Sequence, residues 1–374
     1  MNLLLPWNNP MLMKRISGII ILLLTLVSCK KETADLIWER SFGKGTAYCA
    51  SPSADSGIVS GGTLDGKPYL LKLSEDKEVV VEYTSGYSGL FSSAWSDTSC
   101  FVAAGSSNGK MLLECIDNSG IKRWDTTFTA GFKIEVTHLL TTGNGNFLAL
   151  GSKYPDSLSS GANGLLFVRF DTTGKINAKK EITETNFIAA GSLTVNNTGN
   201  IFLPLTRKTG SAKAKASAAM YNGDFQRIWE TDLYNNPNFG AASKSIILNS
   251  KDQVYVTGKT EISREDEVMD NSFLASLSGS GDVRWKNYLE LNNSGVALLF
   301  DDDMLMMLNM NCLVISMINP DDGSDAGIVR IFSVCNSKTT DTFGYDLDIN
   351  NDGNILISGR KGENFYLALK SSTE

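Results

Sequence analysis

The chain has 374 residues, 42% of them hydrophobic and 20% charged, and its formal net charge is −7. This acidic balance argues against a nucleic-acid-binding protein, which needs a basic face. The 34 glycines suit a turn-rich β protein, and the hydrophobic content is sufficient to fill one large core.

The N-terminal segment has the pattern of an export signal. Lys14 and Arg15 precede an apolar stretch at residues 16–27, and Ser28 and Cys29 follow it. A basic segment, a short apolar segment and a small residue before the cleavage site are typical of a secretory signal peptide. The apolar stretch is shorter than the roughly 20 residues that a membrane span needs. We therefore expect residues 1–28 to be a signal peptide.

The tetrad at residues 26–29 (LVSC) resembles the lipobox of bacterial lipoproteins. The resemblance implies cleavage before Cys29 and acylation of that cysteine, for example with palmitate. Several acyl chains on one residue give firm anchoring, so we expect a lipidated tether at residues 29–35 and an outer-membrane location, on the periplasmic or the cell-surface side. The alternative is an ordinary signal peptide with a chance cysteine. The folded body is expected at residues 36–374.

A short pattern recurs about every fifty residues along this body. One part is a turn of the type Asp-x-x-Gly that leads into a strand with Trp, as in Asp117–Trp124. Another part is an apolar run that ends in Gly, as in Phe101–Gly105 and Asn354–Gly359. Self-similarity at such a period is typical of stacked or circular repeat folds.

Each repeat contains four short apolar runs bounded by Gly, Asn and Asp, and these runs predict antiparallel strands. Equivalent positions at the end of the second strand are Gly61, Gly105, Gly151, Leu205, Gly258, Leu308 and Gly359. Four antiparallel strands form one propeller blade. The sequence therefore predicts an all-β fold, a seven-bladed β-propeller of four-stranded antiparallel blades.

The two ends of the body predict how the ring closes. The last repeat supplies three strands, at Phe343–Ile349, Asn354–Gly359 and Phe365–Lys370, whereas Leu36–Phe42 has the pattern of a lone fourth strand. We expect this N-terminal strand to complete the last blade, which would remove two exposed sheet edges. Equivalent fourth-strand positions then hold Trp38, Trp124, Trp229 and Trp285, which we expect to pack between blades.

The recurring Asp-x-x-Gly-x-x-x-Trp pattern resembles the repeat of quinoprotein-like (PQQ-like) β-propellers, although it is one residue shorter. The resemblance covers residues 36–374 and implies a propeller, but it does not imply the quinone, so no cofactor is expected. The chain also looks like the propeller lipoproteins of bacterial outer membranes that serve as assembly or scaffold subunits. That resemblance implies a protein partner.

Polar residues recur at one position of the predicted innermost strands. They are Ser92, His138, Ser192, Ser245 and Asp346, and we expect them to line the central channel. His138 is the only histidine. Because the sequence places no Cys or Ser partner beside it, it predicts no catalytic triad, and we expect a structural imidazole.

The turn Asp348–Gly353 (DINNDG) fits the start of a calcium loop, with Asp348, Asn350 and Asp352 as the ligands. The twelfth position is Gly359 instead of the usual Glu, and equivalent turns of other repeats lack the carboxylates. We therefore interpret the segment as a hairpin turn and keep a calcium site as the weaker alternative.

Three longer connections join the second and third strands of repeats three to five, at Pro155–Asn163, Thr206–Ala216 and Glu261–Asp270. Function is often carried by such loops. We predict a non-enzymatic lipoprotein whose propeller acts as a protein-binding scaffold at the bacterial outer membrane. One alternative is a carbohydrate or small-ligand binding protein that uses the central channel. A propeller-fold lyase or hydrolase is the weakest alternative. No nucleic-acid partner is expected.

Overall fold

The structure is a computed structural model. It describes residues 36–371 except 97–98, 130–131, 144, 156–163, 185, 209–212, 237, 265–266, 290–292, 302, 312 and 331–340. The predicted signal peptide, the Cys29 lipidation site and the tether lie outside the described residues. Among the described residues, no helix is long and apolar enough to cross a membrane.

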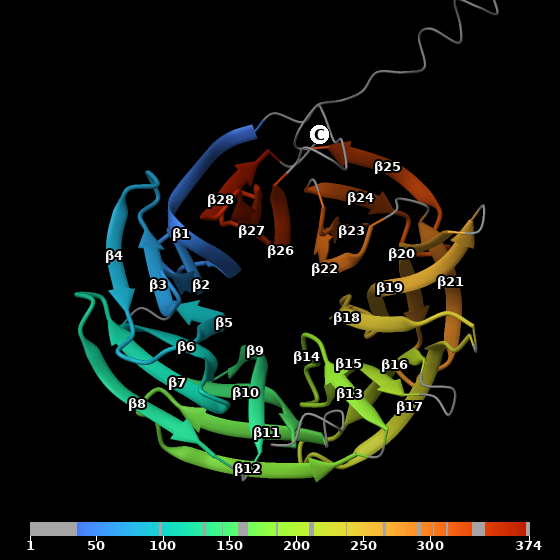
Figure 1. Ribbon diagram of the computed structural model, residues 1–374, viewed down its shortest axis with the longest axis horizontal. Helices are drawn as coiled ribbons and strands as arrows, with labels where there is room; N and C mark the ends of the chain where they lie inside the picture. The colour runs from blue at the N-terminus through green and yellow to red at the C-terminus, as the bar shows by residue number, and fades with distance from the viewer. Residues whose placement is uncertain are drawn as a thin grey trace, which may run out of the picture. The chain divides into compact units, whose positions relative to one another are not determined.

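The described chain consists of antiparallel sheets that stand around a central opening (Figure 1). One sheet contains β5 (Leu90–Ser96), β6 (Cys100–Ser107), β7 (Lys110–Asp117) and β8 (Lys122–Phe128). The next contains β9 (Lys133–Gly143), β10 (Asn146–Tyr154), β11 (Gly164–Asp171) and β12 (Ile176–Thr183). A third contains β13 (Phe187–Ala190), β14 (Thr194–Val195), β15 (Ile201–Lys208), β16 (Ala214–Tyr221) and β17 (Arg227–Tyr234).

Two further sheets have four strands each. One contains β18 (Ala241–Leu248), β19 (Val254–Arg264), β20 (Glu267–Leu277) and β21 (Val283–Leu289). The other contains β22 (Gly295–Asp301), β23 (Met304–Asn309), β24 (Val314–Ile318) and β25 (Asp325–Arg330). The last sheet has the order β26 (Thr342–Ile349), β27 (Ile355–Lys361), β28 (Asn364–Lys370), β1 (Leu36–Pro52), β2 (Ile58–Leu64), β3 (Lys67–Leu73), β4 (Val79–Thr84). This is a propeller architecture, and its 28 strands correspond to about seven blades.

Strand β1 pairs with the C-terminal strand β28 and with its own successor β2. Its first part pairs with β28, with Trp38 opposite Leu369, and its second part pairs with β2. Side chains reinforce the first pairing, because the Glu39 carboxylate accepts hydrogen bonds from the Tyr366 hydroxyl at 2.7 Å and from the Lys361 ammonium at 2.9 Å. The segment that follows the predicted tether is therefore an outer strand beside β28.

Tryptophans of three outer strands connect their sheets to the next one. The indole N–H of Trp124 donates to the Thr172 carbonyl at 2.9 Å, that of Trp229 to Gly279 at 3.0 Å, and that of Trp285 to Pro320 at 3.1 Å. Each acceptor lies in the turn between the third and fourth strands of the following sheet, which we call the 3–4 turn. The recurring Asp-x-x-Gly and Trp pattern is thus a contact between repeats.

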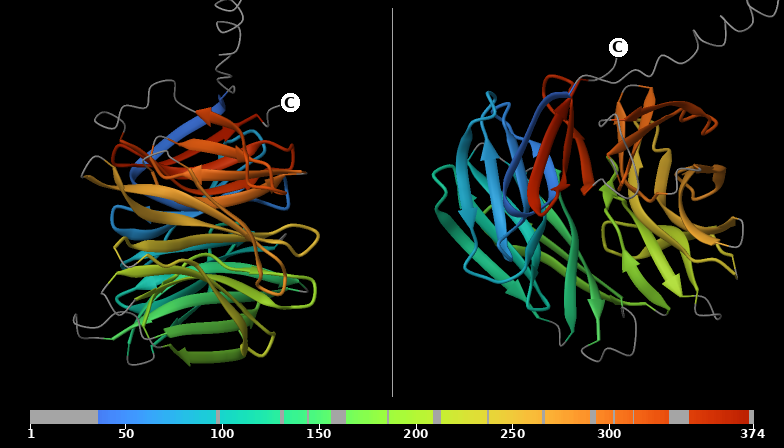
Figure 2. Two further views of the ribbon diagram at one scale, coloured as in Figure 1. Left: turned by 90° about the vertical axis from the view of Figure 1, so that its right-hand side faces the viewer. Right: turned by 45° about the horizontal axis from the view of Figure 1, so that its top comes forward.

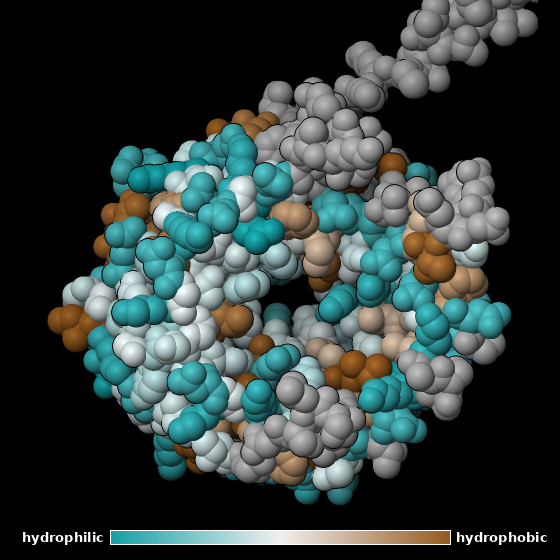
Figure 3. Space-filling model, viewed as in Figure 1, coloured by the Kyte–Doolittle hydropathy of each residue, from teal (hydrophilic) through white to brown (hydrophobic). Residues whose placement is uncertain are grey.

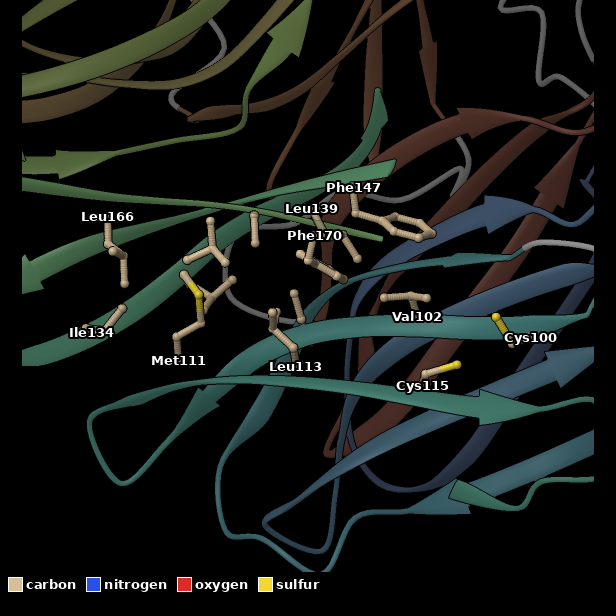
Figure 4. Close-up of a cluster of buried hydrophobic side chains, with 14 residues drawn as sticks. Cys100, Val102, Met111, Leu113, Cys115, Ile134, Leu139, Phe147, Leu166 and Phe170 are labelled. Atoms are coloured by element: carbon tan, nitrogen blue, oxygen red, sulfur yellow. The ribbon is translucent and has the colours of Figure 1, made fainter. Parts of the chain in front are cut away.

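The hydrophobic core lies between neighbouring sheets. Figure 4 shows one cluster, between the β5–β8 and β9–β12 sheets, that includes Val102, Leu113, Phe147 and Phe170. Burying each such side chain contributes about 1.5–3 kcal/mol. Cys100 and Cys115 belong to this cluster as buried residues. Similar clusters fill the other gaps between sheets, so the core runs around the ring.

The strand order gives the ring two different faces. Successive strands in a sheet are antiparallel, so the connections from second to third strands emerge on the same face as those that lead to the next sheet. We call this face A. The opposite face, which we call face B, carries the connections from first to second strands and from third to fourth strands. Figure 2 shows hairpins projecting at both faces.

Candidate functional site

The innermost strands surround a central cavity of about 320 Å³. Figure 3 shows its opening at the middle of the ring. Every sheet contributes to the lining. Four of the five predicted channel residues are among the lining residues, namely His138, Ser192, Ser245 and Asp346. The fifth position of this ring is occupied by Ser93 in place of Ser92.

A β-bulge explains this one-residue difference. In β5, Phe91 pairs with Gly105 and Ser93 pairs with Ala104, so Ser92 is an extra residue without a partner of its own in the ladder. The Ser92 hydroxyl donates to the Ala104 carbonyl at 3.4 Å. Equivalent bulges precede His138, Ser245 and Asp346 in β9, β18 and β26.

Ser192 reaches the cavity for another reason. The innermost strand of its sheet is interrupted between β13 and β14, opposite Pro204 of β15. Proline has no N–H to donate to a neighbouring strand, so it disfavours a continuous ladder at this point. The Gly191 N–H still donates to the Pro204 carbonyl at 3.1 Å, and Ser192 lies in the break between β13 and β14.

Most polar side chains around the cavity bind the backbone of the next innermost strand. The Asp346 carboxylate accepts from the Ala50 N–H at 3.3 Å, and the Ser93 hydroxyl donates to the Leu139 carbonyl at 3.1 Å. The Ser192 hydroxyl accepts from the Ile246 N–H at 3.1 Å and donates to the Ser245 hydroxyl at 3.4 Å. These hydrogen bonds join neighbouring sheets, so the polar ring has a structural role.

Burial shifts the two carboxyl groups and the imidazole of the cavity toward their neutral forms. It raises the pKa of Asp346 to about 8, with a further contribution from Asp348, and raises the pKa of Asp348 to about 6. It lowers the pKa of His138 to about 4. No hydrogen bond joins His138 to a carboxylate among the described residues, so this imidazole has no acid partner there for general acid–base chemistry.

The turn with the calcium-like sequence is held by its own side chains. The Asn350 side-chain carbonyl accepts from the N–H groups of Asp352 at 3.1 Å and Asn354 at 2.8 Å, and its amide donates to the Asp352 carboxylate at 3.1 Å. Asn249 makes the same two backbone hydrogen bonds in the equivalent turn after β18. This shared geometry is that of a hairpin turn, as the sequence predicts for Asp348–Gly353.

A larger groove, of about 600 Å³, opens on face A between the sheet that ends in β17 and the β18–β21 sheet. Tyr234 at the end of β17 and Tyr288 near the end of β21 line it side by side, with ring centroids 4.8 Å apart. Further lining residues are Asn235, Asn236 and Phe239 of the connection to β18, and the segment Thr260–Ser263 of β19. We call this hollow the face A groove.

The acidic connection of repeat five is mostly ordered strand. It extends β19 and β20 into a hairpin of two 11-residue strands, and Glu261 at its base pairs with Lys213 from the preceding sheet at 3.2 Å. Glu261 also accepts from the Gly240 N–H at 2.8 Å. The basic and acidic connections therefore meet on face A. Of the neutral connection at 155–163, only Pro155 lies within the described residues.

Comparison with known proteins supports the fold. No family model and no curated protein matches this chain. The β-propeller domain of Cps50 (Swd1) from Myceliophteria thermophila is similar, with a TM-score of 0.60 and 11% identity over 91% of this chain and 100% of that chain. A protein of unknown function from Bacteroides caccae has a TM-score of 0.45 and 15% identity, over 71% and 92% of the two chains. The first likeness shows a β-propeller fold and nothing finer.

The face A groove was missed by the sequence interpretation. One signal was present, because Tyr288 shares the exposed side of β21 with Arg284 and Lys286. An aromatic residue on the exposed side of an alternating strand is a candidate contact residue. Its partners Tyr234 and Ile262 come from distant segments, and only the folded chain brings them together.

Proposed function

We propose that this chain is a lipid-anchored, non-enzymatic propeller that binds a protein partner at the bacterial outer membrane. We further propose that the ring has seven blades and that the N-terminal strand closes it. The seven sequence repeats, the 28 strands and the pairing of β1 with β28 support this closed ring. The lipobox-like tetrad that ends in Cys29 supports the anchor.

The β19–β20 hairpin carries the proposal of a protein partner. β20 begins at Glu267, but its pairing with β21 begins only where Ser272 lies opposite Leu289. Among the described residues, the segment Val268–Asp270 therefore pairs with β19 alone. Val268 is 63% exposed, although Val is usually buried in a sheet. An exposed apolar residue on a strand that pairs on one side only, as this segment does among the described residues, is a template for a further strand.

Strand addition gives the partner a defined chemistry. An extended segment of another protein would continue the β18–β21 sheet by pairing with Val268–Asp270, and it would place apolar side chains against Val268. The contacts of Glu261 with Lys213 and Gly240 hold the base of the hairpin in place. A fixed edge loses less conformational entropy on binding than a mobile loop does.

Site-specific photo-cross-linking tests this surface. A photoreactive phenylalanine derivative is placed at position 268 of the tagged full-length protein, and in a matched control at position 80. Val80 is also an exposed valine, 52% exposed, on the outer strand β4. We expect a covalent adduct with a specific envelope protein from position 268 only. Equal adducts from both positions, or none from position 268, would contradict the proposal.

The alternative of a ligand in the central channel has less support. The serines that line the cavity already make hydrogen bonds with neighbouring strands, and the cavity volume of about 320 Å³ lies at the lower end of the roughly 300–1,000 Å³ found for small-molecule sites.

A further inference from the structure

The face A groove contains a row of aromatic rings that leads from the core to the surface. Phe273 is fully buried and its ring lies 4.6 Å from that of Tyr234, which lies 4.8 Å from that of Tyr288. Tyr288 is 54% exposed, more than any other aromatic side chain among the described residues. The inner two rings hold Tyr288 in place, so the groove has a preformed aromatic wall.

The charged groups of the groove are already satisfied within the protein. The Lys286 ammonium donates to the Leu233 carbonyl at 3.0 Å and lies 5.6 Å from the centre of the Tyr234 ring. The Glu261 carboxylate binds the Gly240 N–H and Lys213, and these contacts hold its pKa below the usual range. A charged ligand would have to compete with these internal partners, so the groove favours a neutral one.

The remaining polar groups of the lining are uncharged. Asn235, Asn236 and Ser263 are exposed there, and Thr260 lies deeper. Side-chain amides and hydroxyls both donate and accept hydrogen bonds. Such groups around an aromatic wall match a cyclic ligand that has C–H groups on one face of its ring and hydroxyls around the edge. The groove volume of about 600 Å³ is in the range of small-molecule sites.

We propose that the face A groove binds a neutral oligosaccharide, with one sugar ring against Tyr288 and its hydroxyls bonded to Asn235 and Asn236. This site goes beyond the proposed protein-binding function. No residue of β20 is part of its lining, so the two surfaces can be tested separately.

A glycan array tests the proposal. The full-length protein in detergent is applied to neutral oligosaccharides (glucans, mannans, galactans and arabinans) and to glycans that carry uronic or sialic acids. We expect binding to one neutral class, and titration calorimetry with that oligosaccharide then gives the affinity. Tyr288→Ala should weaken binding at least about tenfold, whereas Tyr288→Phe, which keeps the ring, should bind within about threefold of the wild type.

Ile228→Ala is the matched control, because Ile228 is 55% exposed on the outer strand β17 and does not line the groove. Its binding should be unchanged, and all variants should show wild-type unfolding temperatures. The proposal is wrong if no neutral glycan binds, if acidic glycans are preferred, or if Tyr288→Ala binds like the wild type. A cross-link from position 268 that persists in Tyr288→Ala would keep the protein-binding proposal separate from this one.

Discussion

Gly281 lies against the indole of Trp229 from the preceding sheet, so closely that a Cβ atom on Gly281 would stand 2.7 Å from the ring. The same relationship joins Gly323 to Trp285 at 2.6 Å and Gly174 to Trp124 at 2.9 Å. Each glycine has a positive φ and closes a 3–4 turn, and each tryptophan donates a hydrogen bond to that turn. The pattern recurs along the chain because neighbouring sheets must dock in this way.

Replacement of Gly281 by Ala should destabilise the fold through both backbone strain and this contact. The matched control is Gly353→Ala. Gly353 has φ +79°, close to the φ of +91° at Gly281, but a Cβ atom at Gly353 would meet no other atom within 4 Å. The control should lose about 1–2 kcal/mol of unfolding free energy, and Gly281→Ala about 1–3 kcal/mol more. Urea unfolding followed by circular dichroism measures both. Equal losses would show that the Trp229 contact contributes nothing.

Asp346 should make the protein less stable as the pH rises. Its folded pKa of about 8 lies above the ordinary value of 3.8, so its contribution is fully present below about pH 4 and is lost as the pH rises through 8. Asp348, His138 and the Cys49 thiol also face or adjoin this carboxylate, and no Lys or Arg is among the described residues that line the cavity. Asp346→Asn keeps an acceptor for the Ala50 N–H. As the pH rises, its unfolding free energy should fall by at least about 1 kcal/mol less than that of the wild type.

The measurement is the unfolding free energy of both proteins across the range from acid to mildly alkaline pH. If the wild type and Asp346→Asn have parallel curves across this range, the carboxyl group of Asp346 does not titrate as its burial implies.

His138 should act in the opposite direction. Its folded pKa of about 4 lies below the ordinary value of 6.5, so the stability it contributes is present above pH 6.5 and is lost as the pH falls toward 4. The glutamine in His138→Gln cannot be protonated. The unfolding free energy of this variant should therefore fall by about 1–3 kcal/mol less than that of the wild type over this fall in pH. Thermal unfolding in this range detects the difference, and an identical acid-induced loss in both proteins would contradict it.

Cys29→Ser should abolish acylation and release the protein from membranes, because hydroxyl and thiol differ in the chemistry of lipid attachment. Ser28→Ala is the control, since it keeps a small residue before the proposed cleavage site. Incorporation of radiolabelled palmitate and sedimentation of membranes provide two readouts. Labelled palmitate on the Cys29→Ser protein would rule out lipidation at this residue.

The propeller class could be predicted because its signals are local and repeated. The turn and the Trp-containing strand that follows it are each recognised within a few residues, and the contact with the next sheet is the same at Trp124, Trp229 and Trp285. Where the pattern of one repeat is ambiguous, the equivalent segments of the other repeats indicate where its strands lie. This redundancy explains why a propeller of four-stranded units could be predicted from the sequence.

Details of the cavity and the groove were less accessible, for two physical reasons. A bulge adds one residue to a strand without changing its composition, so Ser92 and Ser93 could not be distinguished by spacing. The groove depends on the approach of Tyr234 and Tyr288 from neighbouring sheets. Their separation in sequence varies with the length of the β19–β20 hairpin, which follows no repeat.

Closure of the ring by the N-terminal strand is the central claim, and hydrogen exchange tests it most directly. In the full-length protein, backbone amides of Leu36–Ser41 should be protected to the same degree as those of Phe365–Lys370, because the two segments share their hydrogen bonds. Deletion of residues 36–41 should then deprotect β28 while the β18–β21 sheet stays protected. Fast exchange of Leu36–Ser41 beside a protected β28 would contradict the account.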